Sequence, residues 1–405
     1  MISFDDALRI VLESCGVLGS EDVAVSNCAG RHLAEDVTST ISLPIFDNSA
    51  VDGFAIHAED VARGCKQLKV LGTIFAGDDP AVFVLEQGTT IRVMTGAGIP
   101  SGTSAVVMQE DVQHDGEVAV LNSVDVSERA NIRRAGEEIR PGDTVLSAGL
   151  CCNPATAAAL ATLGRTTVTV HKRPSVGIMV TGAELVQPGG ELQPGQIFES
   201  NSIGLAAAVR AHGINDVVVE TVGDGVSETV AAFQRLAKQC DIVVSSGGVS
   251  VGERDLVRNV YLEHGVKELF WKVAMKPGKP VFFGKSSACL VFGLPGNPVS
   301  ALVTFETLVT PAIRKMSGSL HPVAPRTRIT LTKHIRRKPG RLEFVRATTE
   351  YRDGKPFATP LDRQGSHMTS GLALADRLLI VPLDAECIEA GTELDSMTIG
   401  SGGSR

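Results

Sequence analysis

Three carboxylates follow short apolar runs in the middle of the chain. Glu184 comes after Val-Thr-Gly-Ala, Asp224 after Thr-Val-Gly, and Asp255 after Val-Gly-Glu-Arg. If these runs are parallel strands of one sheet, their carboxyl ends lie at one edge and the three acids converge there. Grouped carboxylates suit Mg²⁺, which takes oxygen ligands and bridges substrate phosphates. A single acid in a loop is usually a solvated helix cap, so the predicted metal site depends on all three lying together.

Two loops in the same region contain residue types that bind anions. Ser245–Ser250 carries two adjacent glycines, which let the backbone approach a ligand and let successive N–H groups form an anion nest. In Leu290–Ala301 an apolar run enters a Pro-Gly turn, after which Asn297 is a favourable N-cap and Pro298 suits the first helical position. A helix beginning there favours an anion through its free N–H groups and its dipole. The alternatives are a tight turn and an ordinary strand–helix junction, both without a ligand.

A lysine-rich segment lies between the two loops. Residues 272–276 are expected to form a strand, and a period of two places Lys272 and Lys276 on the same face, with Lys279 after the Pro277-Gly278 turn. Two ammonium groups beside two anion-binding loops predict a site for a multiply charged oxyanion. The alternative is an edge strand that its lysines keep from pairing with other chains.

The elements that must position these groups alternate between strand and helix from Pro174 onward. We expect strands over 175–181, 216–222, 241–245 and 288–293, and helices over 202–212, 228–239, 256–264 and 299–316. Ser227 is the expected N-cap of the second helix. This alternation predicts a mostly parallel sheet with helices on both faces, in which ligands bind beyond the carboxyl ends of the strands.

The flanking regions have different patterns. Residues 3–19 predict an amphipathic helix and 153–163 an Ala-rich helix, whereas 43–146 and the chain from about 321 alternate short β-runs with turn residues. The predicted fold is therefore multidomain α/β, a central mostly parallel α/β sandwich with a helical and β N-terminal part and a small C-terminal β-barrel. The expected domains are a helical linker domain over 1–42 plus 147–173, a β-rich insertion over 43–146, an α/β domain over 174–320 and a barrel domain over 321–405.

Composition limits the classes of partner. The chain has 405 residues, 43% of them hydrophobic, and a formal net charge of −8, which argues against duplex nucleic acid because that partner needs a basic face. No apolar run approaches the roughly 20 residues of a membrane-spanning helix, and the acidic N-terminus lacks a signal-peptide pattern. The 8 cysteines are scattered without a C-x-x-C pair, so we expect no disulfide framework and a cytoplasmic location.

Several segments together resemble the molybdopterin molybdenumtransferases, the family that includes the E domain of gephyrin. In the second half of the chain the resemblance is carried by Ser245–Asp255 (SSGGVSVGERD), Phe270–Pro280 (FWKVAMKPGKP) and Gly293–Ser300 (GLPGNPVS). The first half adds Phe46–Ala55 (FDNSAVDGFA), Ile91–Ala97 (IRVMTGA) and Asn131–Glu138 (NIRRAGEE). Without the family, the motif at 46–55 would be interpreted as turn chemistry. These motifs span nearly the whole chain in the family's order.

The resemblance implies an α/β domain of the molybdopterin-binding type and a set of site residues. The implied catalytic residues are Glu184, Asp224, Asp255 and Asp52, of which the first three are also the expected Mg²⁺ ligands. The expected substrate-binding residues are Thr95, Ser246, Gly247, Gly248, Lys272, Lys276, Lys279, Pro295, Gly296, Asn297, Pro298, Arg346 and Ser366. The chain departs from the family's pattern where Ala183 replaces the first acid of Thr-Gly-Asp-Glu and Gly225 the second acid of an Asp-Asp pair.

The function that the resemblance implies is a last step of molybdenum cofactor biosynthesis. Molybdate would enter adenylylated molybdopterin with Mg²⁺-assisted release of AMP, at a site between the subunits of a homodimer, with transient contact to the upstream adenylyltransferase. Neither nucleic acid nor a membrane is an expected partner. The alternatives are a molybdopterin adenylyltransferase, a tungstate-specific homologue and a non-enzymatic gephyrin-like scaffold. The flanking domains count against the first, and the retained acids and lysines count against the last.

Overall fold

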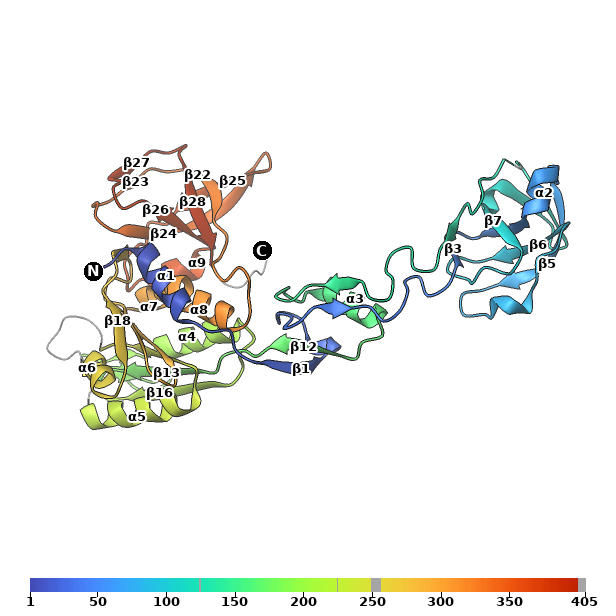
Figure 1. The fold of residues 1–405 in the computed structure, drawn as a ribbon. Helices are drawn as coiled ribbons and strands as arrows, with labels where there is room; N and C mark the ends of the chain where they lie inside the picture. The colour runs from blue at the N-terminus through green and yellow to red at the C-terminus, as the bar shows by residue number, and fades with distance from the viewer. Residues whose placement is uncertain (124, 224, 249–255, 400–405) are drawn as a thin grey trace. The chain divides into compact units, whose positions relative to one another are not determined.

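A computed structural model describes residues 1–123, 125–223, 225–248 and 256–399, and the chain divides into two compact units. The first unit contains residues 1–35, 149–157 and the chain from 166 onward, and the second contains 36–148 and 158–165. Figure 1 labels the elements of both units, and each is described here by itself. Two of the predicted acids, Asp224 and Asp255, lie outside the described residues.

A six-stranded sheet forms the centre of the first unit (Figure 1). The strand order is β16–β13–β17–β21–β20–β18, in which the first four strands are parallel and the last two pair antiparallel. The strands are β13 (Val176–Thr181), β16 (Val217–Val222), β17 (Ile242–Ser246), β18 (Lys267–Trp271), β20 (Phe282–Lys285) and β21 (Leu290–Leu294). The predicted mostly parallel sheet is confirmed.

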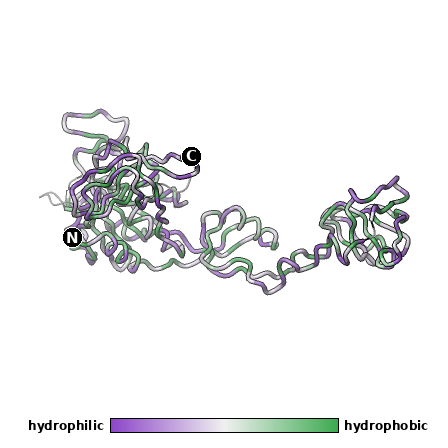
Figure 2. The backbone as a smooth tube through the Cα atoms, turned by 90° about the horizontal axis from the view of Figure 1, so that it is seen from above, coloured by the Kyte–Doolittle hydropathy of each residue, from purple (hydrophilic) through white to green (hydrophobic). Residues whose placement is uncertain are grey.

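Helices cover both faces of this sheet, because its strands are apolar on both sides. Successive strand residues point to opposite faces, so Ile178 belongs to one buried cluster and Met179 to another. The first cluster includes side chains of α1, α4, α7 and α8, and the second includes side chains of α5 and α6. Apolar segments run through the interior of this unit in the hydropathy-coloured trace (Figure 2). The helices are α1 (Phe4–Ser14), α4 (Asn201–Arg210), α5 (Val226–Gln239), α6 (Leu256–Glu263), α7 (Pro298–Thr304) and α8 (Thr310–Met316).

Two helix predictions need correction. The expected helix over 299–316 contains a π-helical segment, η4 (Phe305–Val309), between α7 and α8. Pro311 follows it and cannot donate to the carbonyl four residues earlier, so the regular ladder is interrupted here. In α5 the N-cap is Gly225 rather than Ser227. In the described part of the chain, no helix is long and apolar enough to span a membrane.

The C-terminal part of the first unit is a closed barrel. Its strands follow the order β24–β25–β22–β28–β26, and β26 pairs back onto β24. The strands are β22 (Thr327–Leu331), β24 (Leu342–Arg352), β25 (Lys355–Pro360), β26 (Arg377–Val381) and β28 (Glu393–Thr398), with the helix α9 (Thr369–Leu374) before β26. The short strand β19 (Met275–Lys276) adds to β24, and β23 (Ile335–Arg336) pairs with β27 (Cys387–Ile388). The predicted small barrel is confirmed.

The N-terminal residues join the first unit through one helix and one ladder. Ser3 accepts a hydrogen bond from the Asp6 amide at the start of α1, and Phe4, Ala7 and Val11 are buried in the main core. The strand β1 (Ser20–Ala24) pairs antiparallel with β12 (Thr167–His171). The amphipathic spacing therefore predicts this helix correctly, although α1 ends at Ser14, several residues before Gly19.

The second unit is built on a mixed six-stranded sheet, in agreement with its β-rich sequence pattern. The strand order is β7–β4–β6–β5–β9–β8. The strands are β4 (Gly53–His57), β5 (Gln67–Ile74), β6 (Thr89–Val93), β7 (Thr103–Met108), β8 (Val112–His114) and β9 (Val118–Leu121). Short pairs join β2 (Val37–Thr38) to β11 (Thr144–Leu146) and β3 (Asn48–Ser49) to β10 (Ile132–Arg133). The helix α2 (Ala58–Arg63) lies between β4 and β5 in sequence, and α3 (Pro154–Thr162) follows β11.

Candidate functional site

A cavity of about 650 Å³ opens at the carboxyl ends of β13, β17 and β21. Parallel α/β sheets place ligands at such an edge. The lining residues are Val180–Gly182, Glu184, Leu185, Ile197–Asn201, Ser246–Gly248, Pro280, Pro295–Pro298 and His367. The residues predicted from the sequence that line this cavity are Glu184, Ser246, Gly247, Gly248, Pro295, Gly296, Asn297 and Pro298.

The two glycines after β17 form one edge of the cavity, and their backbone conformation requires glycine. Gly247 has φ +96° and Gly248 φ +65°. A Cβ on Gly247 would lie 2.7 Å from the Thr181 carbonyl oxygen, and one on Gly248 would lie 2.4 Å from Cγ2 of Val257. The Gly247 N–H donates to the Leu294 carbonyl at 3.2 Å, so this group of the expected anion nest is already engaged within the protein.

Asn201 joins the glycine loop after β17 to the turn before α7, although no motif in the sequence points to it. Its Nδ2 donates to Ser246 Oγ at 2.8 Å and to the Gly296 carbonyl at 2.7 Å. The Ser246 hydroxyl donates in turn to the Pro295 carbonyl at 3.2 Å. Asn201 is the first residue of α4, and its position in the sequence indicates only the start of a helix. Its contacts with β17 and with the turn after β21 depend on the tertiary fold.

The start of α7 is where the Asn297 motif predicts it, but its polar groups face another part of the chain. Asn297 is the N-cap residue without a side-chain capping bond, and its Nδ2 donates to Ser366 Oγ at 3.0 Å. The Val299 N–H donates to the Ser366 carbonyl at 3.2 Å. The predicted anion-binding helix start is therefore corrected in part, because a barrel-domain loop satisfies one of its N–H groups. The same contacts bring the predicted residues Asn297 and Ser366 together.

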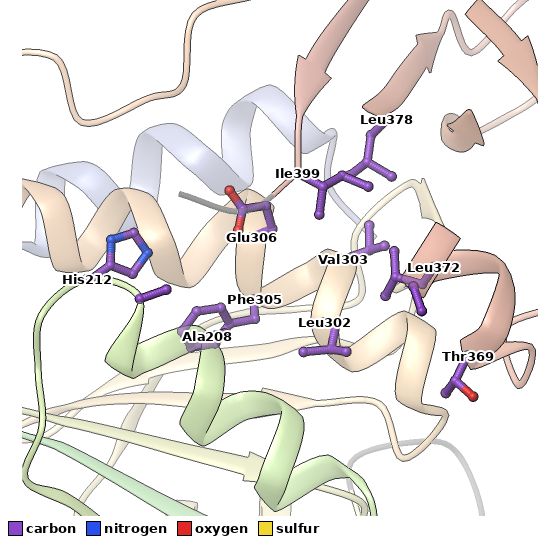
Figure 3. A pocket seen from close by; sticks show the side chains of 12 residues that line it. Ala208, His212, Leu302, Val303, Phe305, Glu306, Thr369, Leu372, Leu378 and Ile399 are labelled. Carbon is purple, nitrogen blue, oxygen red and sulfur yellow. The ribbon is translucent and has the colours of Figure 1, made fainter. Parts of the chain in front are cut away.

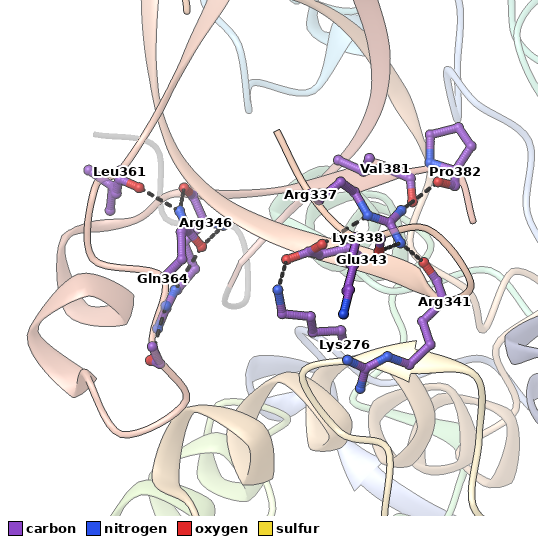
Figure 4. Close-up of polar contacts among 11 residues, drawn as sticks. Lys276, Arg337, Lys338, Arg341, Glu343, Arg346, Leu361, Gln364, Val381 and Pro382 are labelled. Atoms are coloured by element: carbon purple, nitrogen blue, oxygen red, sulfur yellow. Dashed lines mark hydrogen bonds and ion pairs between the residues drawn. The ribbon is translucent and has the colours of Figure 1, made fainter. Parts of the chain in front are cut away.

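Arg346 lies beneath the loop that carries Ser366. The residue is 1% exposed, and its guanidinium donates to Gln364 Oε1 and to the carbonyls of Gly365 (3.1 Å) and Met368 (3.3 Å). Gln364 Nε2 donates back to the Arg346 carbonyl at 2.8 Å (Figure 4). Burial lowers the pKa of Arg346 below its ordinary value. These bonds fix the loop on which Ser366 and the cavity residue His367 stand.

The expected lysine-bearing strand is wrong in its first part. Only Met275 and Lys276 are in a strand, and Lys272 has φ +67°, so the two lysines do not alternate along one strand face. The segment leaves the central sheet after Trp271 and joins the barrel at β24, and the change of sheet breaks the period of two. Lys272 Nζ lies 3.8 Å from the centroid of the Trp271 ring.

The lysines do not belong to the described residues that line the cavity. Lys276 Nζ forms an ion pair with Glu343 Oε1 at 2.8 Å (Figure 4). Lys279 is exposed after the turn. Glu343 could not be predicted from the sequence, because only the register of β19 against β24 places it opposite Lys276.

The acidic residues at the cavity have different roles. Glu184 is exposed after β13, whereas Glu199 is buried and its carboxylate accepts hydrogen bonds from the Ser202 amide and hydroxyl at the start of α4. Among the residues that the structure describes, no group of three or more His, Cys, Asp and Glu side chains is arranged to hold a metal ion. The expected metal site also needs Asp224 and Asp255, outside the described ranges, so its three-acid arrangement stays a prediction.

The second unit brings together the two residues that the resemblance marks there. Asp52 Oδ1 accepts hydrogen bonds from the Thr95 amide and the Thr95 hydroxyl, each at 2.7 Å. These two bonds hold the pKa of Asp52 below its ordinary value. Gly53 follows at the start of β4, where a Cβ would lie 2.2 Å from the Val107 carbonyl oxygen.

A second cavity, of about 350 Å³, lies in the first unit between α4, η4 and α9 (Figure 3). Its lining is mostly apolar and includes Leu302, Phe305 and Leu372, with two ionisable groups, Glu306 and His212. Burial raises the pKa of Glu306 and lowers that of His212 to about 4, so desolvation shifts each group toward its neutral form. This cavity contains none of the predicted site residues.

Comparison with known protein families identifies the class. The model for the MoeA N-terminal region (domain I and II) matches residues 2–164, a probable molybdopterin binding domain matches 177–315, and the MoeA C-terminal region (domain IV) matches 328–399. Together with the cavity at the carboxyl ends of β13, β17 and β21, these matches define a multidomain protein with an α/β domain of the molybdopterin-binding type.

Relatives that match over their full length identify the family within this class. The molybdopterin molybdenumtransferase 2 of Mycobacterium tuberculosis is 38% identical over 97% of this chain and 98% of that protein. The molybdopterin molybdenumtransferase of Haemophilus influenzae is 36% identical over 96% and 97%. The crystal structure of the molybdopterin biosynthesis moeA protein from Pyrococcus horikoshii OT3 matches with a TM-score of 0.83 and 31% identity, covering 98% of this chain and 100% of that one. The chain belongs to the molybdopterin molybdenumtransferase family and is an enzyme of molybdenum cofactor biosynthesis.

Proposed function

We propose that the chain inserts molybdate into adenylylated molybdopterin and releases AMP. The observation that carries the proposal is the cavity at the carboxyl ends of the parallel strands, where Asn201 ties the glycine loop after β17 to the turn before α7. A cavity of about 650 Å³ is in the size range of small-molecule and cofactor sites. The full-length match to relatives named for this activity supports the same reaction and does not favour an adenylyltransferase or a scaffold.

In this proposal the two loops shape the pocket for the pterin and the nucleotide, and charged groups bind the oxyanions. The proposed oxyanion ligands are Lys272, Lys276, Lys279 and Ser366, and Arg346 is proposed as a residue that supports them. Arg346 contributes to the site by fixing the loop of Ser366, because its guanidinium donors are engaged with that loop. Asp52 and Thr95 are proposed as further site residues, and their mutual hydrogen bonds support a common role.

We propose Mg²⁺ as the metal, with Glu184, Asp224 and Asp255 as its ligands. The described part of the site fits a hard cation, because Glu184 brings an exposed carboxylate to the cavity and none of the described lining residues is a cysteine. Bound Mg²⁺ would neutralise charge on the phosphoanhydride. The protein's own contribution is to hold the carboxylates at strand ends and to position water.

We propose that the enzyme acts in the cytoplasm as a homodimer whose active site lies between subunits. The supporting observation is apolar surface at α9, where Leu374 is 60% exposed, because a second copy of the chain would remove that surface from water. A transient contact with the upstream adenylyltransferase would pass on a reactive anhydride without its release. We also propose the four-domain division given above, which the bounds of the three matched family regions support.

Three incubations of the purified chain test the reaction against its alternatives. Adenylylated molybdopterin with molybdate and Mg²⁺ is expected to release AMP. Molybdopterin with ATP is expected to give no pyrophosphate, which an adenylyltransferase would produce. Replacing molybdate by tungstate distinguishes the two metals, and the proposal predicts the higher kcat/KM with molybdate. No AMP release with either oxyanion would contradict the proposed activity.

A further inference from the structure

Glu343 is a nearly buried carboxylate that contacts one of the proposed oxyanion ligands. It lies on β24 opposite Lys276 of β19, in a parallel pair whose register aligns the two residues. Glu343 Oε1 is 2.8 Å from Lys276 Nζ. The Glu343 side chain is 9% exposed and that of Lys276 is 47% exposed. The contact therefore joins a fixed carboxylate to a lysine that still reaches solvent (Figure 4).

A second cation fixes Glu343 from the other side. Arg337 Nε lies 3.1 Å from Glu343 Oε2, as an ion pair without hydrogen-bond geometry. The Arg337 side chain is 2% exposed, and its other nitrogens donate to the carbonyls of Pro382 (2.6 Å), Lys338 (3.1 Å) and Arg341. Because Arg337 is bound to the backbone at several points, Glu343 is held in place and can orient Lys276.

We propose that Glu343 is a positioning residue, which holds the Lys276 ammonium in the orientation that binds the oxyanion substrate. The inference deepens the proposed function and rests on it. A free lysine side chain has several rotamers, and ordering it costs free energy at the moment of binding. A carboxylate that orders the side chain beforehand removes part of that cost. Strand β24 would then support both halves of the oxyanion site, since it also carries Arg346.

For Glu343→Gln, the proposal predicts a change in molybdate affinity opposite to the change expected from charge alone. A carboxylate next to an ammonium reduces the attraction for an oxyanion, so by charge alone Glu343→Gln should tighten molybdate binding. If positioning dominates, the same substitution weakens molybdate binding and raises its half-saturating concentration roughly tenfold. The direction of the change distinguishes the two effects.

A double-mutant cycle tests the proposal. The molybdate concentration for half-maximal AMP release is measured in the wild type, Glu343→Gln, Lys276→Met and the double variant. The expected result is a rise in Glu343→Gln that disappears in the Lys276→Met background, because Glu343 acts through Lys276. Glu350→Gln is the matched control on the same strand, where the carboxylate pairs with Arg352 at the surface, and no change is expected.

Other results would overturn the inference. One is a half-saturating molybdate concentration that is lower or unchanged in Glu343→Gln. The other is a rise in this concentration that persists in the Lys276→Met background, which would indicate a general loss of structure. If circular dichroism shows that Glu343→Gln does not fold, Glu343→Asp replaces it in the cycle. Calorimetric titration with molybdate in the presence of AMP repeats the comparison without turnover. The wild type could release no AMP while calorimetry still shows that Glu343 and Lys276 are coupled in molybdate binding. That result would contradict the proposed reaction but not the role of Glu343.

Discussion

The close approach of the backbone at Gly247 makes a quantitative prediction for Gly247→Ala. An L-residue at this positive φ costs about 1–2 kcal/mol, and the added Cβ would lie 2.7 Å from the Thr181 carbonyl oxygen and 3.1 Å from its hydroxyl. Relieving such a contact in a packed region costs about 1–3 kcal/mol more. We therefore expect Gly247→Ala to lower the free energy of unfolding of the α/β domain by about 2–5 kcal/mol.

Gly265→Ala is the matched control. Gly265 has φ +85° in the same domain, but nothing lies within 4 Å of its added Cβ, so only the backbone strain of about 1–2 kcal/mol is expected. Trp271, the single tryptophan, ends β18 of this sheet, and its fluorescence during urea unfolding monitors this domain. Equal losses in the two variants would refute the reasoning, because the contact between Gly247 and Thr181 would then contribute nothing.

Three further predictions follow from the site. Arg346→Met leaves several acceptors of the Ser366 loop unpaired, so we expect a loss of about 3 kcal/mol in unfolding free energy and a raised KM, measured by urea unfolding and AMP release. Thr95→Val removes one of the two bonds that lower the pKa of Asp52, and NMR titration should show that pKa moving up toward the ordinary value of an aspartate. The stability from Asp52 is complete above its unfolded pKa and is lost as pH falls through the lower folded pKa, so Thr95→Val should weaken the acid dependence of unfolding. Glu184→Gln should lower the turnover rate roughly 10²–10³-fold without loss of fold, and a near-normal rate over a Mg²⁺ titration would exclude its proposed role.

Local patterns predict the central elements well because those elements are buried in the way their periodicity requires. The runs that become β13, β17 and β21 are apolar on both faces, which is typical of a parallel strand covered by helices on both sides. The start of α7 at Pro298 also follows from local chemistry, since proline suits the first turn. The cavity edge formed by the glycines could therefore be located before the structure.

Contacts between distant segments could not be predicted in the same way. The period of two in 272–276 contains no sign that the chain leaves one sheet for another, which puts Lys276 opposite Glu343 and leaves Lys272 over Trp271. The sequence around Asn297 predicts a helix start that is available to a ligand. In the structure the Asn297 side chain donates a hydrogen bond to Ser366, 69 residues away. Asn201 could not be predicted for the same reason, because it belongs to no motif and contributes by hydrogen-bonding two distant loops.

The most direct test of the central claim is a single-turnover measurement of AMP release. The purified chain is mixed with a stoichiometric amount of adenylylated molybdopterin and Mg²⁺, and AMP and protein-bound molybdenum are followed with and without molybdate. The account predicts AMP release that depends on molybdate, with one molybdenum retained on the pterin for each AMP formed. AMP release at the same rate without molybdate, or molybdenum uptake without AMP, would contradict it.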